Sequence, residues 1–214
     1  MPIRILLADD HAIVREGLRT ILEAQGDMKV VGEAGNGREA LDKAVSLRPD
    51  IILMDISMPE LSGIDATRLI LMQVPAAKIV ILSTHHTTEY ISRAIQAGAR
   101  GFIHKESAGC SVVNAVRAVM KGRQYFSEGI VALNIKRSGS PVHSQTPLGS
   151  LSRRERETLQ LIVEGNTNAT IAKLFNVSPK SVETYRSRMM QKLDISNVPA
   201  LVIFAIRHGV ISLP

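Results

Sequence analysis

Along the first 122 residues, short apolar runs alternate with longer segments in which apolar residues recur every three or four positions. A short apolar run bounded by turn residues is typical of a strand that is buried on both faces. Such runs lie at Ile3–Ala8, Val30–Ala34, Ile51–Met54, Ile79–Leu82 and Gly101–His104. The periodic segments predict helices near residues 12–25, 37–47, 62–72, 88–97 and 107–121. This alternation predicts an α/β domain, with a parallel sheet, right-handed crossovers and helices on both faces.

After residue 150 the pattern predicts helices only. Four are expected, from Ser152 to Gly165, from Asn168 to Phe175, from Ser178 onward and from Asn197 to His208. Ser152 and Glu155 form a capping box at the start of the first helix, and Ser178 precedes a proline that is favoured at the first helical position. Since the second and third helices are joined by a tight turn, they predict a helix-turn-helix within a small all-α domain.

Residues 123–150 separate the two patterns. Ser127 is expected to cap one brief helix over Ile130–Ile135. The stretch 136–150 is rich in Ser, Gly and Pro, a composition that buries too little apolar surface to order itself. The sequence therefore predicts a domain at 1–122, a linker at 123–150 with a short helix and a flexible stretch, and a second domain at 151–214.

The net charge of +6 is unevenly distributed. Residues 1–122 hold 14 Lys or Arg against 14 Asp or Glu, whereas residues 151–214 hold 9 against 5. Residues 123–150 add 3 against 1, so the basic excess lies in the back half of the chain. Such an excess is expected if that half binds a polyanion such as nucleic acid. A basic surface that serves only solubility is the alternative that charge leaves open.

Three features indicate a cytoplasmic protein without a membrane partner. The single cysteine, Cys110, excludes an internal disulfide and fits a reducing compartment. The N-terminal apolar run contains Arg4 and ends in two acidic residues, so it does not resemble a secretion signal. No stretch approaches the roughly 20 apolar residues that a membrane span requires.

The stretch from Asp50 to Pro59 carries the most informative single residue, Asp55. Asp55 follows a buried strand, and open α/β sheets bind their ligands at the carboxyl ends of the strands. Taken alone, such a carboxylate is a metal ligand, a nucleophile or a solvated strand terminus. The other strand ends supply its companions, which are Asp9, Asp10, Ser83 and Lys105.

Carboxylates that converge on one point repel one another unless a cation joins them. Oxygen ligands of this kind suit Mg²⁺, or Mn²⁺ in its place. We expect Asp10 and Asp55 to bind the ion directly, Asp9 to bind it through water and the Ser57 carbonyl to add an oxygen. The ion and Lys105 would then neutralise a phosphoryl group at Asp55, and Ser83 would hydrogen-bond it.

Together, Asp9-Asp10, Asp55 followed by Met58-Pro59 and Gly63, Ser83 and Lys105 resemble the receiver domain of bacterial response regulators over residues 3–121. The resemblance implies a flavodoxin-like (βα)5 fold and a sensor histidine kinase that phosphorylates Asp55. It implies that Lys105 pairs with the phosphoryl group and that Ser83 reports its presence. The receiver would catalyse only its own phosphorylation and dephosphorylation, so that the protein is a regulator rather than an enzyme.

Three further positions bear on this switch. Phe102 stands where many receivers carry an aromatic ring that rotates, and it would act by packing alone because it has no hydroxyl. Ser57 and His85 each lie two residues beyond a site residue and would flank the path of attacking water. We expect these two residues to tune the lifetime of the phosphorylated form.

The second domain resembles the LuxR-type DNA-binding domain over residues 151–211. The resemblance lies in Leu151–Glu157, Glu164-Gly165, Asn168, Ile171-Ala172 and Ser178–Arg186. With the receiver, it implies the NarL/FixJ subfamily of response regulators and a double-stranded DNA operator as partner. Base contacts are expected from Glu183, Thr184, Ser187 and Arg188, and backbone contacts from Lys180, Tyr185 and Arg186. Ala169-Thr170 and Tyr185 depart from the residues most frequent in the family, which makes the target site harder to infer.

In the family the fourth helix pairs two copies, and Leu201, Val202 and Ala205 offer an apolar face for this, unless that face packs wholly within its own domain. Phosphorylation is then expected to shift an equilibrium from an occluded form to an open, dimerising form, which binds two half-sites about one helical turn apart. RNA polymerase is a further candidate partner.

Three other readings compete with this one. An aspartyl-phosphate hydrolase would need a second carboxylate near its nucleophile, and position 57 is Ser. A LuxR-type sensor of a small autoinducer would need an apolar ligand pocket, which the first domain does not suggest. A regulator that works through protein contacts without phosphorylation is compatible with the acidic residues.

Overall fold

The computed structural model describes residues 1–84, 88–126, 147–208 and 210–211. The chain forms two compact units, Met1–Ser140 and Pro141–Pro214. The first contains one sheet of strands in the order β2-β1-β3-β4-β5-β6, and every neighbouring pair is parallel. The strands are β1 (Ile3–Ala8), β2 (Met28–Ala34), β3 (Ile51–Asp55), β4 (Lys78–Ser83), β5 (Gly101–His104) and β6 (Tyr125–Phe126). The α/β fold predicted for this domain is confirmed.

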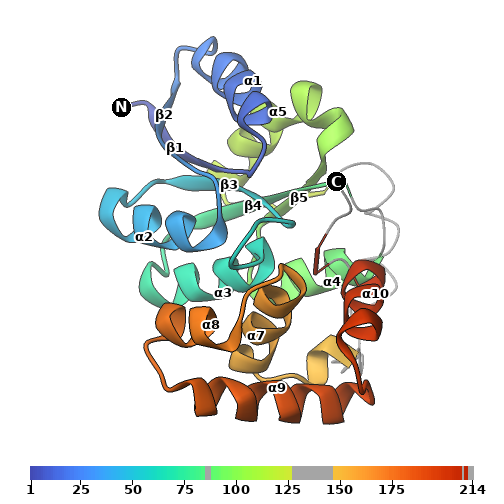
Figure 1. Cartoon of the computed structure of the whole chain (residues 1–214). Coiled ribbons are helices and arrows are strands. Elements are labelled where there is room, and N and C mark those ends of the chain that lie inside the picture. The colour runs from blue at the N-terminus through green and yellow to red at the C-terminus, as the bar shows by residue number, and fades with distance from the viewer. Residues whose placement is uncertain (85–87, 127–146, 209, 212–214) are drawn as a thin grey trace. The chain divides into compact units, whose positions relative to one another are not determined.

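Helices cover both faces of the sheet (Figure 1). They are α1 (Ala12–Glu23), α2 (Gly37–Leu47), α3 (Gly63–Gln73), α4 (Thr88–Ala97) and α5 (Ala108–Met120). Side chains alternate along a strand, so each strand supplies both faces. In β3, Ile51 and Leu53 pack with α1 and α5, whereas Ile52 and Met54 pack with α2, α3 and α4. This burial on both sides explains the uninterrupted apolar run in the sequence.

The ends of the predicted linker belong to the two domains, so its expected bounds are corrected. Tyr125–Phe126 forms β6, which pairs with β5 through Gly101 and Phe102. At the other end, Pro147–Ser150 forms a 3-10 turn, and Leu148 is buried in the core of the second domain. The flexible stretch predicted at 136–150 is therefore too long at its C-terminal end. The helix predicted over Ile130–Ile135 lies outside the described residues.

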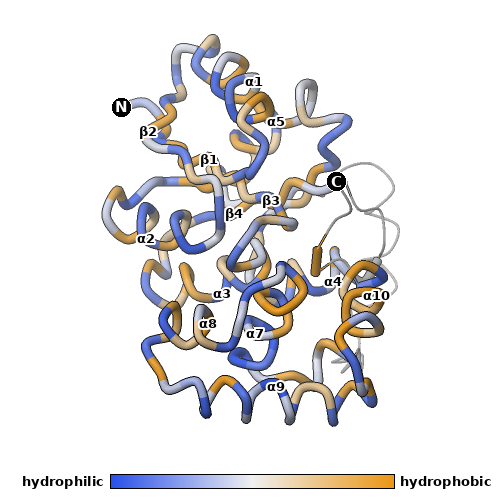
Figure 2. The backbone as a smooth tube through the Cα atoms, in the orientation of Figure 1, coloured by the Kyte–Doolittle hydropathy of each residue, from blue (hydrophilic) through white to orange (hydrophobic). Residues whose placement is uncertain are grey.

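The second unit contains α7 (Arg153–Val163), α8 (Asn168–Phe175), α9 (Pro179–Leu193) and α10 (Val198–Arg207). A polar side chain caps the start of each helix by accepting a backbone hydrogen bond, as the sequence predicts for Ser152 and Ser178. Figure 2 shows that α10 is hydrophobic along most of its length. Among the described residues no single helix is long and apolar enough to cross a membrane, although α9 and α10, bent by 66°, together meet that criterion of length and composition.

The capping box at α7 also joins this helix to the end of α9. Glu155 is buried, and its Oε2 accepts hydrogen bonds of 2.7 Å from the Ser152 backbone N–H and from Lys192 Nζ. Desolvation alone would raise the pKa of Glu155, but the hydrogen bonds from Lys192 and Ser152 outweigh it and lower the pKa. A carboxyl group whose pKa is lowered on folding stabilises the fold above its ordinary pKa, and this contribution is lost as the pH falls through the folded value.

We predict that Glu155→Gln lowers the free energy of unfolding of this domain by about 1 to 2 kcal/mol at pH 7. The figure is modest because the Lys192 side chain is 41% exposed. Urea unfolding at pH 7 and at pH 3.5 tests this, because the difference from the wild type should shrink at the lower pH. Glu183→Gln, at an exposed position of α9, is the matched control. An equal difference at both pH values would contradict the role assigned to the Glu155 charge.

Candidate functional site

Polar residues gather at one edge of the sheet because the parallel strands all end there. Asp9 follows β1, Asp55 and Ser83 are the last residues of β3 and β4, and Lys105 follows β5. The register confirms that these ends are adjacent, since Ala8 pairs with Met54, and Asp55 with Leu82. Asp55, Asp9 and Lys105 therefore come together from three different strands, as the sequence predicts.

Lys105 joins the two buried carboxylates. Its Nζ lies 2.8 Å from Asp55 Oδ2 and 2.8 Å from Asp9 Oδ2. Asp9 is 1% exposed and Asp55 is 3% exposed. Burial raises the pKa of Asp55 to about 7, and the nearby charge of Asp9 adds to this, although Lys105 acts in the opposite direction. Burial alone would lower the pKa of Lys105, but the interactions with Asp55 and Asp9 together outweigh it and raise the pKa, so Lys105 stays protonated.

Asp10 and His11 complete an acidic cluster with Asp9 and Asp55. The ligand atoms of these four residues all lie within 4.8 Å of one another. Asp10 is exposed, and its Oδ1 lies 2.7 Å from His11 Nδ1. Three carboxylates are balanced here by the single ammonium group of Lys105, and hard oxygen donors of this kind suit Mg²⁺ or Mn²⁺. The donor set therefore fits a divalent cation.

The loop after β3 is packed tightly beneath Asp55. A side chain on Gly63 would place its Cβ 1.8 Å from the Asp55 carbonyl oxygen, and the Gly63 backbone N–H donates to the Ile56 carbonyl at 2.9 Å. Glu60 adopts a φ of 65°, which few residues other than glycine do. Half-buried Ser57 lies in this loop, two residues beyond Asp55. A glycine is thus needed for α3 to begin directly against the backbone of Asp55.

In the second domain, α9 presents one polar stripe to solvent. The exposed residues recur every three or four positions, as one face of a helix requires, and are Lys180, Glu183, Thr184, Ser187, Arg188 and Gln191. The opposite face is anchored by Val182 and Met189, which are fully buried. Tyr185 is half-buried and packs against the same core. The helix therefore has one face available for a partner, and that face carries donors, acceptors and charge.

Two family models match the chain. Residues 5–117 match the model described as "Response regulator receiver domain", and residues 149–205 match the model described as "Bacterial regulatory proteins, luxR family". The protein is a two-component response regulator. It joins a receiver domain to a LuxR-type DNA-binding domain, as the resemblance in the sequence implies.

Similar regulators are known as whole proteins and as structures. The response regulator UvrY of Escherichia coli strain K12 is 39% identical over 207 residues, which cover 97% of this chain and 95% of UvrY. A LuxR-family two-component response regulator from Aurantimonas is 37% identical, with a TM-score of 0.60 over 64% of this chain and 97% of that one. The response regulator RcsB in its complex with DNA is 27% identical, with a TM-score of 0.59 over 95% of this chain and 98% of RcsB.

The residues expected to carry a switch in the response regulator lie in its core. Ser83 and Phe102 are both fully buried, and their strands β4 and β5 are paired. The Phe102 ring meets the His104 ring edge-on, with centroids 5.8 Å apart. Phe102 is thus enclosed by the protein rather than turned to solvent. His85, expected to tune dephosphorylation, lies outside the described residues.

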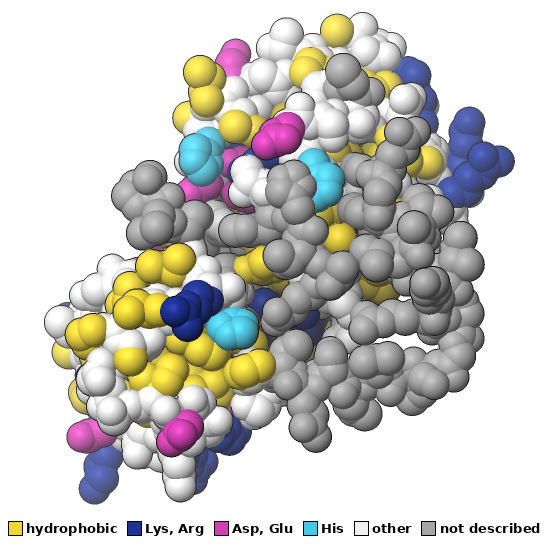
Figure 3. Space-filling view, turned by 90° about the vertical axis from the view of Figure 1, so that its right-hand side faces the viewer, with side chains coloured by type: hydrophobic (Ala, Val, Ile, Leu, Met, Phe, Trp, Pro, Cys, Tyr) yellow, Lys and Arg dark blue, Asp and Glu magenta, His cyan; other side chains and the backbone are white. Residues whose placement is uncertain are grey.

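The dimerisation face expected on α10 needs correction. Leu201 and Ala205 are fully buried, and Leu201 belongs to the core of its own domain, so neither is accessible to a second copy. Val202 is half-buried, and Ile203 is 52% exposed. Figure 3 shows hydrophobic side chains gathered over the face where α10 lies. Of the three predicted residues only Val202 is therefore partly accessible, and Ile203, which was not predicted, is the more exposed apolar residue beside it.

Two residues next to the acidic cluster were missed by sequence reasoning. His11 contacts Asp10 through its side chain, and its backbone N–H donates to Asp9 Oδ1 at 2.9 Å. Arg15 donates from its Nη1 to the Asp9 carbonyl oxygen at 2.6 Å. His11 directly follows the acidic pair, which is a signal that the sequence contains. Arg15 lies one helical turn further on and is recognisable only once α1 is placed beside the site.

Proposed function

We propose that this response regulator accepts a phosphoryl group on Asp55 from a sensor histidine kinase and, in that state, binds operator DNA as a dimer to regulate transcription. The observation that carries this is the position of Lys105, 2.8 Å from both buried carboxylates at the edge of the sheet. A protonated amine at this place can neutralise a phosphoryl group on the neighbouring oxygen.

Each residue of the cluster has a defined task in the transfer. An Asp55 carboxylate oxygen bonds to the phosphorus as the bond to the donor's histidine nitrogen breaks. Asp10 and Asp55 would hold Mg²⁺ or Mn²⁺, with Asp9 acting through water and the Ser57 carbonyl as a further ligand, and this cation supplies positive charge to the phosphoryl oxygens. Lys105 supplies a second cation that is already anchored by Asp9. Phosphoryl transfer needs little beyond such positioning and charge.

The same residues catalyse only the phosphorylation of the receiver itself and the later hydrolysis of its phosphoryl group. Ser57 and His85 set the lifetime of the phosphorylated form. Ser83 hydrogen-bonds the new phosphoryl group, which adds roughly −1.5 to −2 charge. Phe102 is buried on β5, which pairs with the strand of Ser83, and its ring repacks in response to this new bond. The phosphoryl group shifts the equilibrium between the occluded form and the open, dimerising form only because its contacts differ in the two forms.

The DNA-binding step belongs to the polar stripe of α9. Base edges in the major groove are approached by four residues that are exposed along one face, Glu183, Thr184, Ser187 and Arg188. The sugar-phosphate backbone of the DNA is contacted by Lys180, Tyr185 and Arg186. The similarity to RcsB, whose complex with DNA is known, supports this assignment. Two copies, paired through the exposed part of α10 around Val202 and Ile203, read half-sites about one helical turn apart. The regulator acts in the cytoplasm, with RNA polymerase as a further partner.

The phosphorylation switch predicts tighter binding of the activated protein to its operator. A duplex selected from a random pool by the wild-type protein serves as the probe, and its affinity is measured by fluorescence anisotropy with and without beryllofluoride, which mimics the phosphoryl group. We expect tighter binding with beryllofluoride at every salt concentration, because activation adds a second half-site contact. Equal affinity across the whole salt series would defeat the switch and favour a regulator that works without phosphorylation.

A further inference from the structure

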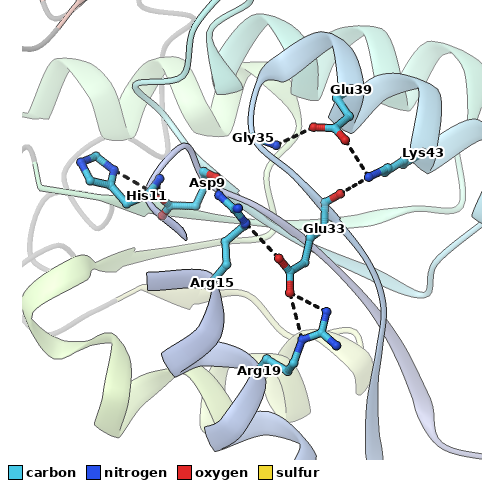
Figure 4. A network of polar contacts seen from close by, with 8 residues as sticks. All are labelled: Asp9, His11, Arg15, Arg19, Glu33, Gly35, Glu39 and Lys43. Carbon is cyan, nitrogen blue, oxygen red and sulfur yellow. Dashed lines mark hydrogen bonds and ion pairs between the residues drawn. The ribbon is translucent and has the colours of Figure 1, made fainter. Parts of the chain in front are cut away.

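A chain of hydrogen bonds and ion pairs extends from the acidic cluster across α1, β2 and α2 (Figure 4). Arg15 contacts the cluster through the Asp9 carbonyl oxygen, and its Nε donates to Glu33 Oε2 at 3.0 Å. Glu33 also accepts, through its other carboxylate oxygen, a hydrogen bond of 2.9 Å from Arg19 Nε. The Glu33 backbone carbonyl accepts from Lys43 Nζ, which pairs with Glu39 at 2.7 Å. Arg15 is therefore held on one side by a carboxylate that is itself held in place.

The contacts of Asp9 show what Arg15 adds. The Asp9 backbone N–H donates to the Ala34 carbonyl at 3.1 Å. Of its side-chain oxygens, Oδ1 accepts from the His11 backbone and Oδ2 forms an ion pair with Lys105. These contacts fix the amide and the carboxylate of Asp9. The carbonyl is the remaining polar group, and Arg15 binds it at 2.6 Å. Because the Asp9 carbonyl and the Asp10 amide belong to one planar peptide group, Arg15 sets the direction in which the chain continues into Asp10.

Asp10 depends on this direction more than Asp9 does. Among the described residues its exposed side chain pairs only with His11, at 2.7 Å, and the His11 side chain is itself 63% exposed. No buried partner therefore orients the Asp10 carboxylate directly. The position of the Asp10 carboxylate relative to Asp55 is therefore set by the direction of the Asp9–Asp10 peptide group. Outer residues that orient metal ligands in this way typically change metal affinity by about 10- to 100-fold when they are replaced.

We infer that Arg15, locked by Glu33, is a positioning residue that aims Asp10 at the divalent cation and so sets the affinity of the receiver for that ion. This inference rests on the proposed function of the acidic cluster as a cation site. Arg15 is 18% exposed and contacts both the Asp9 carbonyl and Glu33, which a planar guanidinium can do at fixed geometry. A lysine has the same charge, but its single ammonium group cannot reproduce this fork.

The chain contains a matched control in Arg19. Arg19 binds the same carboxylate from the same helix, but it contacts Glu33 rather than Asp9, and it is 40% exposed. Arg15→Lys and Arg19→Lys therefore make the same chemical change to two arginines that share one partner. Only the first removes the contact that reaches the Asp9 carbonyl. A role in local stability alone would affect both variants, whereas a role in positioning the ligand would affect one.

The test measures Mn²⁺ affinity of the full-length protein by electron paramagnetic resonance of the free ion, beside thermal melting. We expect Arg15→Lys to weaken Mn²⁺ binding by about tenfold or more and Arg19→Lys to leave it unchanged. Glu33→Gln weakens the hold on Arg15 without changing Arg15 itself, and it should also weaken Mn²⁺ binding. This variant takes the place of Arg15→Lys in the test if Arg15→Lys does not fold. Unchanged affinity in Arg15→Lys or in this replacement, or equal weakening in both arginine variants, overturns the inference.

Asp10→Asn separates this inference from the proposed function. If the wild type binds Mn²⁺ and Asp10→Asn loses most of that affinity, the cluster is the cation site, and an unaffected Arg15→Lys then overturns the positioning role alone. If Asp10→Asn binds Mn²⁺ as tightly as the wild type, the proposed cation site fails and the positioning role fails with it.

Discussion

The Asp55→Asn variant is expected to take up no phosphoryl group from acetyl phosphate and Mg²⁺ under conditions in which the wild-type protein takes up one. The substitution preserves the shape of the side chain but removes the carboxylate that would bond to phosphorus. Neither Asp9 nor Asp10 should substitute for Asp55. Asp9 is already bound by Lys105 and His11, and Asp10 follows β1, so its carboxylate does not take the position that Asp55 has at the end of β3. Intact-mass measurement before and after incubation gives the result directly.

A surface aspartate supplies the control for this experiment. Asp27→Asn makes the same chemical change at a side chain that is 52% exposed and should take up the phosphoryl group as the wild type does. Uptake by Asp55→Asn equal to that of the wild type would move the acceptor to another residue. If neither protein is modified, beryllofluoride binding separates a strict need for the kinase from a regulator that does not use phosphorylation.

The stability of the variant shows whether it is folded when it fails to react. Since the pKa of Asp55 is raised on folding to about 7, its ionised form destabilises the folded state, and this penalty grows as the pH rises from the unfolded pKa to the folded one. At pH 8 and without divalent cations the penalty is complete, and an asparagine removes it. The melting temperature of Asp55→Asn should therefore equal or exceed that of the wild type. A much lower value would mean that the loss of uptake reflects unfolding.

The sequence predicts the site well where the fold alone decides the position of a side chain. Asp9, Asp55 and Lys105 each follow an apolar strand, and a parallel sheet brings all such ends to one edge. Their convergence requires no knowledge of side-chain packing. The two 2.8 Å contacts of Lys105, in contrast, depend on rotamers and on the competition among three carboxylates. These details cannot be obtained from spacing along the chain.

Packing decided the features that the sequence could not predict. β6 is only two residues long and shows no periodicity, and its pairing to Gly101 depends on the edge that β5 leaves open. The error at Leu201 and Ala205 has a different origin. Since α10 is apolar on almost every side, its sequence does not reveal which face enters the core and which remains exposed. The Arg15–Glu33 contact joins residues 18 positions apart on a helix and a strand, so local patterns do not indicate it.

The Arg188→Ala substitution in α9 is expected to weaken binding to the selected operator by about 1 to 3 kcal/mol, roughly 5- to 150-fold. Arg188 is exposed on the same face as Thr184, whose hydroxyl donates to the Lys180 carbonyl of its own helix at 3.0 Å. Because this bond occupies the Thr184 hydroxyl proton, Arg188 is the stronger donor at this point of the stripe. A guanidinium that donates to two acceptors of one guanine discriminates against the other bases.

The salt dependence separates base contacts from backbone contacts, and this makes the assignment testable residue by residue. Lys180→Ala should weaken binding to operator and unrelated duplexes alike and reduce the slope of affinity against salt by about one, as expected for one lost phosphate contact. Arg188→Ala should instead relax the base preference at one operator position. Arg207→Ala, at an exposed position of α10, removes the same charge away from the stripe and should leave base preference unchanged. If Arg188→Ala and Arg207→Ala behave alike, Arg188 contributes only its charge, and base recognition must come from the remaining residues of the stripe.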